Sequence, residues 1–193
     1  MSRKIIITVI LMLFLLPFVS WYYLQSGLNW RKQAQVVMNG TKLFPEGKWM
    51  DHSGKLLASD DLSQHVSIIS IVTCENKDSL SATLNAFYRQ FKDTKKANFI
   101  ILNACAAMPD IMTDTTKTAW YVFNCGESIP LCDSILLHWP AGKTHALIDR
   151  NKVIRAYYDE TTKNEKRILL EHMALLLPRE RSDQIELKRG TQK

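Results

Sequence analysis

The longest apolar stretch of the chain lies at its N-terminal end. Residues 5–24 contain no charged side chain, and about 20 apolar residues in a helix cross the ~30 Å hydrocarbon core of a bilayer. Arg3 and Lys4 precede this stretch, and the aromatic residues 21–23 close it, as amphipathic rings do at a membrane interface. The pattern predicts a transmembrane helix that stays attached as a signal-anchor.

A cleaved signal peptide is the competing interpretation of residues 5–24. Such a peptide has an apolar core of about 7–15 residues followed by small residues at the cleavage site, whereas this run is longer and ends in bulky aromatics. We favour a single-pass anchor with the short N-terminus inside, although Arg31 and Lys32 add positive charge on the far side. The remaining chain then lies on the periplasmic side of a cell inner membrane, or in the equivalent intermembrane space, where disulfides form.

Beyond the anchor, two uninterrupted apolar runs flank an amphipathic segment. Residues 66–72 read VSIISIV and residues 98–104 read NFIILNA, which is typical of strands buried on both faces. Between them, residues 77–91 place leucines and aromatics at helical spacing. This strand–helix–strand order predicts the βαβ unit of a parallel sheet.

Shorter signals around this unit predict two hairpins, one strand and two helices. In chain order they are a hairpin turning at 51–54, a strand at 119–123, a short helix at 128–137, a hairpin of 144–149 with 153–157, and an amphipathic helix at 162–177. Together with the βαβ unit, these elements predict an α/β protein with a thioredoxin-like fold and an N-terminal hairpin extension.

The same signals divide the 193 residues into five parts. They are a short inner N-terminus (1–4), the transmembrane signal-anchor (5–24), a connector (25–47), the thioredoxin-like domain (48–178) and a charged tail (179–193) that we expect to be disordered. The content of 46% hydrophobic residues excludes disorder over most of the length, and the mean hydropathy of -0.14 excludes a polytopic membrane protein. The net charge of +6 is not concentrated as a nucleic-acid footprint would be.

Four features of the chain resemble those of one known protein family. A single anchor precedes the domain, residues 51–62 resemble an opening hairpin of the form D-x-x-G followed by leucine, the strand ending in Thr73-Cys74 resembles one that leads into a T-x-C-P-x-x-C-P loop, and residues 146–177 resemble a closing hairpin and helix. By these features the chain resembles the SCO/SenC family, membrane-anchored thioredoxin-fold proteins linked to cytochrome c oxidase assembly. The resemblance covers about residues 48–178 and implies a respiratory oxidase or its assembly factors as partners.

The resemblance also implies a copper site, from which this chain departs. The family holds copper with two cysteines spaced C-x-x-x-C and a distant histidine. Here the first position is Cys74 and the second is Asp78, while His138 and His145 bracket the position of the histidine without matching its register. These four residues are the candidate metal ligands, and copper is the candidate cofactor, but a lone thiolate with a carboxylate is a poor Cu(I) site.

The four cysteines carry the remaining candidate chemistry. Cys74 follows a buried strand and precedes a helix, where a helix N-terminus stabilises a thiolate; redox work, metal binding and an inert thiol all stay open for it. Cys105 follows the second buried strand, so Cys74 and Cys105 fall at one sheet edge and either form a disulfide or remain free thiols. Cys125 and Cys132 flank a bend and are a small disulfide loop, unpaired thiols or a metal pair.

Three functions remain open from these observations. The first is an assembly factor that assists a respiratory oxidase through copper or thiol handling. The second, favoured by the missing copper ligands, is a non-catalytic accessory subunit or binding module of a membrane complex. The third is a thiol–disulfide oxidoreductase that uses Cys74, for which Cys105 would have to serve as the resolving cysteine. Absence of catalysis is the expected case, and His172, beside Glu171 in the last predicted helix, is expected to be solvated.

Overall fold

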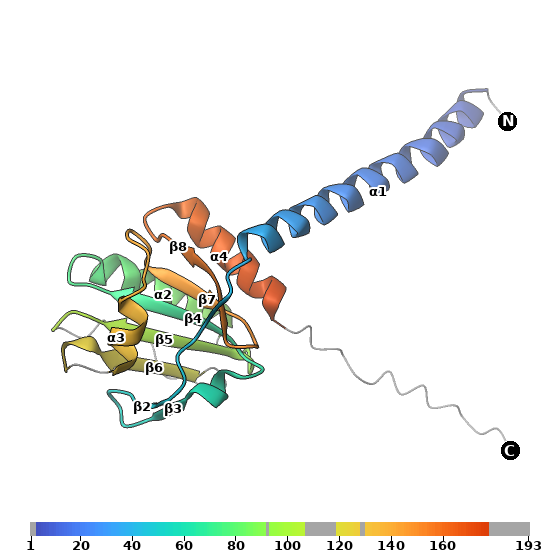
Figure 1. The fold of residues 1–193 in the computed structure, drawn as a ribbon. Helices are drawn as coiled ribbons and strands as arrows, with labels where there is room; N and C mark the ends of the chain where they lie inside the picture. The colour runs from blue at the N-terminus through green and yellow to red at the C-terminus, as the bar shows by residue number, and fades with distance from the viewer. Residues whose placement is uncertain (1–2, 92, 107–118, 128–129, 178–193) are drawn as a thin grey trace, which may run out of the picture. The chain divides into compact units, whose positions relative to one another are not determined.

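The computed structural model describes residues 3–91, 93–106, 119–127 and 130–177 (Figure 1). These residues form two compact units, which the contacts divide at Met1–Gly40 and Thr41–Lys193. The first unit is dominated by one long helix, and the second contains all of the described strands.

The first unit consists of helix α1 (Arg3–Val37), which continues well past the predicted anchor at residues 5–24. Pro17 lies inside the helix without ending it, as membrane helices tolerate. The large apolar side chains from Leu11 to Leu24 are exposed. Among the described residues, Leu11–Val37 is the one helical segment long and apolar enough to cross a membrane, and a signal sequence passes the same test.

The second unit is built on a six-stranded sheet of the described residues, in the order β1-β8-β7-β4-β5-β6. Its strands are β1 (Lys42–Leu43), β4 (Val66–Val72), β5 (Ala97–Asn103), β6 (Ala119–Asn124), β7 (His145–Ile148) and β8 (Val153–Tyr158). Strands β4, β5 and β6 are parallel, whereas β7 is antiparallel to β4 and β8 to β7. The carboxyl ends of β4, β5 and β6 therefore lie at the same edge of the sheet, which we call the carboxyl edge.

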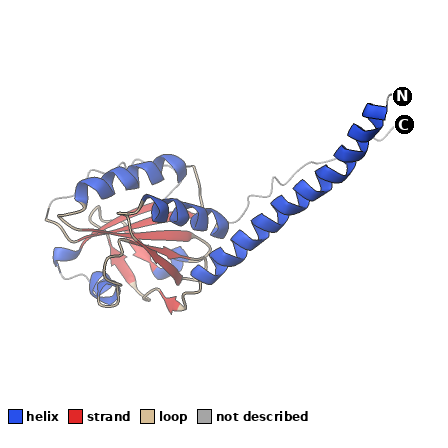
Figure 2. Cartoon of the chain, turned by 90° about the horizontal axis from the view of Figure 1, so that it is seen from above, coloured by secondary structure: helices blue, strands red, loops and turns tan. Residues whose placement is uncertain are grey.

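Helices and a hairpin cover the two faces of the sheet (Figures 1 and 2). Helices α2 (Lys77–Phe91) and α4 (Lys163–Leu176) pack on one face, where Phe87 contacts His145 and Phe91 contacts Phe99. Helix α3 (Pro130–Leu136) and the hairpin of β2 (Lys48–Met50) and β3 (Leu56–Ala58) share a hydrophobic cluster with the other face. Every residue of β4 and β5 is buried, because both faces of the central sheet are covered.

The predicted order of elements in the domain matches the observed one, and the thioredoxin-like fold class is confirmed. Predicted bounds match for β4 and differ by one residue at one or both ends for β5, β6, β7, β8 and α4. The first two residues of the predicted short helix at 128–137 lie outside the described ones. Strand β1 was not predicted, because two residues show no periodicity and owe their strand geometry to pairing with β8. The predicted disorder of residues 179–193 also falls outside the described part of the chain.

Candidate functional site

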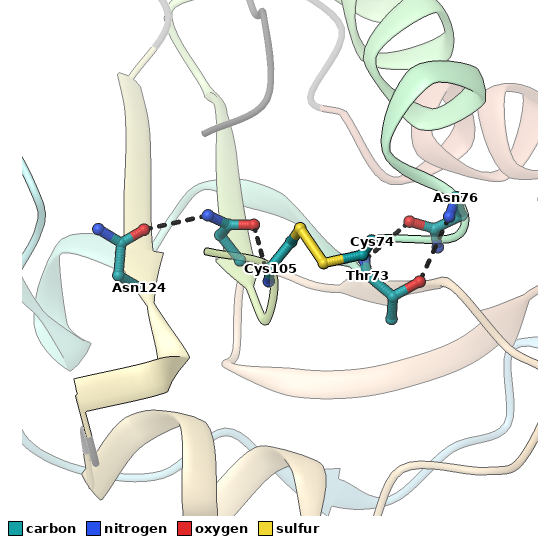
Figure 3. The surroundings of a disulfide bond; sticks show 6 residues. Thr73, Cys74, Asn76, Cys105 and Asn124 are labelled. Carbon is teal, nitrogen blue, oxygen red and sulfur yellow. Dashed lines mark hydrogen bonds between the residues drawn. A yellow bond between two sulfur atoms is a disulfide. The ribbon is translucent and has the colours of Figure 1, made fainter. Parts of the chain in front are cut away.

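A disulfide between Cys74 and Cys105 lies at the carboxyl edge of the sheet. The parallel register pairs Val72 with Asn103, the last residues of β4 and β5. Each cysteine comes two residues after its strand, so the register brings the two cysteines level with each other. Their Cα atoms are 4.9 Å apart and their sulfur atoms are bonded (Figure 3).

The turn that carries Cys74 is fixed by its two polar neighbours. The Asn76 side chain accepts a hydrogen bond from the Thr73 backbone N–H at 2.8 Å and donates one to the Ile71 carbonyl at 3.3 Å. Helix α2 begins at Lys77, directly after this turn. The Cys74 residue is exposed, so a thiolate from solvent can approach its sulfur, and the helix N-terminus favours negative charge there.

Cys105 is held by an amide side chain from β5. The Cys105 backbone N–H donates to Asn103 Oδ1 at 3.2 Å, and Asn103 Nδ2 donates to Asn124 Oδ1 at the end of β6, also at 3.2 Å (Figure 3). The Ala104 backbone N–H donates to the Val72 carbonyl at 2.8 Å, which extends the ladder one step beyond the strands. Cys105 is half-buried, so it is less accessible than Cys74.

A second disulfide joins Cys125 to Cys132, with their Cα atoms 5.6 Å apart. Cys125 opens the short 3-10 helix η2 (Cys125–Glu127) after β6, and Cys132 lies in α3. Cys132 is only 1% exposed and belongs to the hydrophobic cluster under α3. This disulfide fastens α3 to the end of β6 and has one sulfur inside the core.

The candidate copper ligands do not form a metal site. Cys74 is bonded to Cys105 and offers no thiolate in this state. Asp78 lies exposed in the first turn of α2, and His138 lies exposed just after α3. Within residues 3–91, 93–106, 119–127 and 130–177, no group of three or more His, Cys, Asp or Glu side chains could hold a metal ion. The donor set therefore does not fit the family's copper centre.

His145, the remaining candidate ligand, lies in the interior under α2. It is 0% exposed, its Nδ1 is 2.8 Å from Ser70 Oγ, and its Nε2 has no hydrogen-bond partner. Burial, with a smaller contribution from the charge of Lys166, lowers the pKa of His145 to about 3. A neutral imidazole enclosed in this way is a part of the core.

The expectation that His172 is solvated is wrong. His172 is 4% exposed, and its Nδ1 is 2.7 Å from the Tyr158 hydroxyl. Burial lowers the pKa of this histidine and raises that of Tyr158. The neighbouring Glu171 suggested a solvated helix face, but adjacent residues of a helix point in directions about 100° apart.

Several residues around the disulfide were not singled out from the sequence. Asn76, Asn103 and Asn124 each follow or end a strand, and His52 lies in the turn of the β2–β3 hairpin. Polar residues just beyond parallel strands are the signal that would have found the three asparagines. No local pattern points to His52, because its contact with Asn124 spans 72 positions of sequence.

Solved structures share this fold at low sequence identity. BsSco, a member of the Sco family of cytochrome c oxidase assembly proteins with a disulfide switch, superposes with a TM-score of 0.52 at 10% identity, over 72% of this chain and 97% of that chain. A SCO1/SenC family lipoprotein from Bacillus anthracis gives 0.50 at 14% identity, over 72% and 96% of the two chains. A putative thiol:disulfide interchange protein DsbE from Chlorobium tepidum gives 0.51 at 14% identity, over 73% and 99%.

These likenesses define the class of fold. No protein-family model matches the chain, and no curated protein matches it. The chain has a thioredoxin-like fold of the kind that SCO/SenC proteins and DsbE-type proteins share.

Proposed function

We propose that this protein is a thiol–disulfide oxidoreductase that uses Cys74 and Cys105 as its redox pair. The observation that carries the proposal is the exposed disulfide at the carboxyl edge, directly before the N-terminus of α2. A partner's thiolate attacks the Cys74 sulfur, and Cys105 leaves as a thiolate. A second thiol then attacks the mixed disulfide and releases Cys74, so that two thiols become one disulfide while the pair becomes a dithiol.

The same proposal assigns the protein to the outside of the cytoplasm. Helix α1 would anchor it in a membrane, and its exposed apolar side chains between Leu11 and Leu24 support this role. Two disulfides among the described residues are expected in an oxidising compartment such as the periplasm. The partner would be an extracytoplasmic protein that carries reactive cysteines.

Assistance to a respiratory oxidase is a second, narrower candidate. It is supported by the likeness to BsSco, whose family is that of cytochrome c oxidase assembly proteins and which has a disulfide switch. In this chain the role would be thiol handling, because the donor set does not fit a copper centre. A non-catalytic binding module is the competing function, and it needs no accessible disulfide.

A trapping experiment separates catalysis from binding alone. The full chain in detergent would first be reduced and then mixed with a disulfide-containing peptide. Covalent adducts would be detected by mass spectrometry. Cys105→Ser should accumulate a mixed disulfide at Cys74, because the resolving thiol is missing. The matched variant Cys74→Ser should not accumulate one at Cys105, which is less accessible. Equal behaviour of the two variants, or no adduct in either, would contradict the proposal.

A further inference from the structure

A large apolar side chain lies exposed at the end of α3. The residues that this helix buries in the hydrophobic cluster are Leu131, Cys132 and Ile135. Leu137 follows Ile135 by two residues, which places it about 200° further round the helix and away from that cluster. Its backbone N–H still donates to the Asp133 carbonyl at 3.1 Å, so the helical direction is kept there. Leu137 is 80% exposed, the largest exposed fraction among the large apolar side chains described in the second unit.

The loop formed by residues 137–142 is fixed by contacts of its own. Trp139 Nε1 donates to the Lys143 carbonyl at 2.7 Å, and the Trp139 ring packs edge-on against the Tyr157 ring with their centres 5.1 Å apart. Gly142 adopts a φ of 74°, which favours glycine. A loop fixed in this way loses little conformational entropy when another chain binds to it.

The same loop joins α3 to β7 at the carboxyl edge (Figure 1). Thr144 follows it, and the Thr144 carbonyl accepts a hydrogen bond at 2.9 Å from the N–H of Ile71, three residues before Cys74. Tyr157, which Trp139 contacts, lies on β8, two strands from β4, and neighbouring strands are about 4.8 Å apart. A specific protein interface covers about 800 Å² on each partner, a patch about 16 Å in radius. A polypeptide that brings a thiol to Cys74 is therefore expected to cover the loop as well.

The chemistry of the loop favours an apolar partner segment. Residues 137–142 read LHWPAG and contain no carboxylate, ammonium or guanidinium group. Leu137, Pro140 and Ala141 are exposed. Contact between such side chains and apolar side chains of a partner removes both surfaces from water. A charged partner segment would find no opposite charge within the loop.

We propose that the loop of residues 137–142 is the docking surface for the partner of the redox pair, and that Leu137 selects polypeptides with apolar side chains beside the reactive cysteine. This inference rests on the proposed function, because the partner must carry a thiol. The partner's thiolate attacks the Cys74 sulfur while an apolar side chain next to that thiol packs against Leu137. Cys105 leaves as a thiolate in the same step, so docking changes the rate of the exchange and leaves its stoichiometry unchanged.

The test compares two peptide dithiols as reductants of the oxidised full chain in detergent. The peptides have equal length and charge, and differ only in the residues beside each cysteine, which are leucine in one and serine in the other. Loss of the protein disulfide over time, quenched with acid and measured by alkylation and mass spectrometry, gives the two rate constants. Burial of one leucine side chain is worth about a tenfold preference. The wild-type protein should therefore react about tenfold faster with the leucine peptide than with the serine peptide.

Variants of two exposed leucines locate the source of that preference. Leu137→Ser should reduce it to about twofold or less, whereas Leu137→Met should keep it, because an apolar side chain of similar size remains. Leu43→Ser is the matched control. Leu43 is 67% exposed, but it pairs with Val153 at the edge of the sheet opposite the carboxyl edge. Its replacement should leave the preference at about tenfold.

The outcomes separate the docking surface from the redox pair. If Leu137→Ser keeps the wild-type preference, if Leu43→Ser loses it equally, or if the wild-type protein shows none, the inference about the loop is overturned while the redox pair stands. If neither peptide reduces Cys74–Cys105, the proposed function fails, and the inference fails with it.

Discussion

The two disulfides lie at the same edge of one sheet but in different surroundings. Cys74–Cys105 joins the loops that follow two neighbouring strands, and Cys74 is exposed. Cys125–Cys132 spans only seven positions of sequence, and Cys132 is 1% exposed within a hydrophobic cluster. Thiol–disulfide exchange requires an attacking thiolate to reach a sulfur atom. Burial thus favours exchange at the first disulfide and a packing role for the second.

Selective reduction should separate the two disulfides by the largest factor. In the wild-type protein, dithiothreitol should reduce Cys74–Cys105 faster than Cys125–Cys132, because exchange requires access to a sulfur atom and Cys132 is 1% exposed. Alkylation of new thiols over time, followed by trypsin and mass spectrometry, measures both rates. The tryptic peptides 56–77 and 97–117 carry one cysteine each, and 118–143 carries the other two. Similar rates for both pairs would show that burial does not separate the reactivity of the two disulfides.

Removal of each disulfide should lower the free energy of unfolding in an order opposite to the order that loop length alone predicts. The chain-entropy relation assigns about 4 kcal/mol to a loop of ~31 residues and about 2.5 kcal/mol to one of ~7. A pair that exchanges readily with partners must stabilise the fold less than that, because ease of reduction and stabilisation are linked. We expect urea unfolding to show a loss of about 3–4 kcal/mol for Cys125→Ala/Cys132→Ala and under about 2 kcal/mol for Cys74→Ala/Cys105→Ala.

A larger loss of stability for the Cys74–Cys105 pair would change the interpretation of that disulfide. If Cys74→Ala/Cys105→Ala loses the larger free energy of unfolding, the exposed disulfide is a structural cross-link, and the non-catalytic interpretation gains. Cys74 is exposed, so its replacement removes little packing, and a large loss could come only from the cross-link itself.

The buried residue His145 offers a second comparison between the interior of the domain and the carboxyl edge. His145 is neutral in the folded protein because its pKa is lowered to about 3, while the unfolded chain takes up a proton near 6.5. Its contribution to stability is therefore complete above pH ~6.5 and falls by about 1.4 kcal/mol per pH unit below it, down to the folded-state pKa. Urea unfolding between pH ~7 and ~4.5 should show a shallower pH dependence for His145→Gln than for wild type.

Parallel curves of stability against pH for wild type and His145→Gln would contradict this expectation. His172, whose pKa is also lowered by burial, remains in both proteins and gives each the same background slope. If His145→Gln and wild type lose stability equally as the pH falls, His145 is not the neutral interior group that its burial indicates.

The fold was readable from the sequence because its strongest signals are local. VSIISIV and NFIILNA are continuous enough to predict strands buried on both faces, and α2 was predicted with its observed bounds. Strand β1 was missed, because its two residues become a strand only through pairing with β8. Tertiary pairing of this kind leaves no periodic trace in the sequence.

The site could be predicted from the sequence only in outline. The positions of Cys74 and Cys105 after parallel strands indicated a shared edge, but the pairing stayed open, because it depends on a register that composition does not show. The hydrogen bonds that lead from Cys105 to His52 join β5, β6 and the β2–β3 hairpin, and the longest step spans 72 positions of sequence. Such contacts are set by the assembled sheet.

The smallest expected effect compares two asparagines at opposite ends of β5. Asn103 is 1% exposed and holds Cys105, whereas Asn98 is 3% exposed and donates to the Asp61 carbonyl at 3.5 Å, at the other end of the strand. Replacing either with alanine leaves buried hydrogen-bonding groups without partners and should cost about 1–3 kcal/mol of stability. Only Asn103→Ala should also make Cys74–Cys105 easier to reduce, by about fivefold in glutathione buffer.

The pair of variants separates a local effect on the redox pair from general weakening of the sheet. Urea unfolding supplies the stability of each variant, and the glutathione equilibrium supplies the state of the disulfide. If Asn98→Ala shifts that equilibrium as far as Asn103→Ala does, the shift follows from loss of stability, and the hydrogen bond to Cys105 has no special part in it. If only Asn103→Ala shifts it, the position of Cys105 is held by that amide, and the carboxyl edge differs chemically from the rest of the sheet.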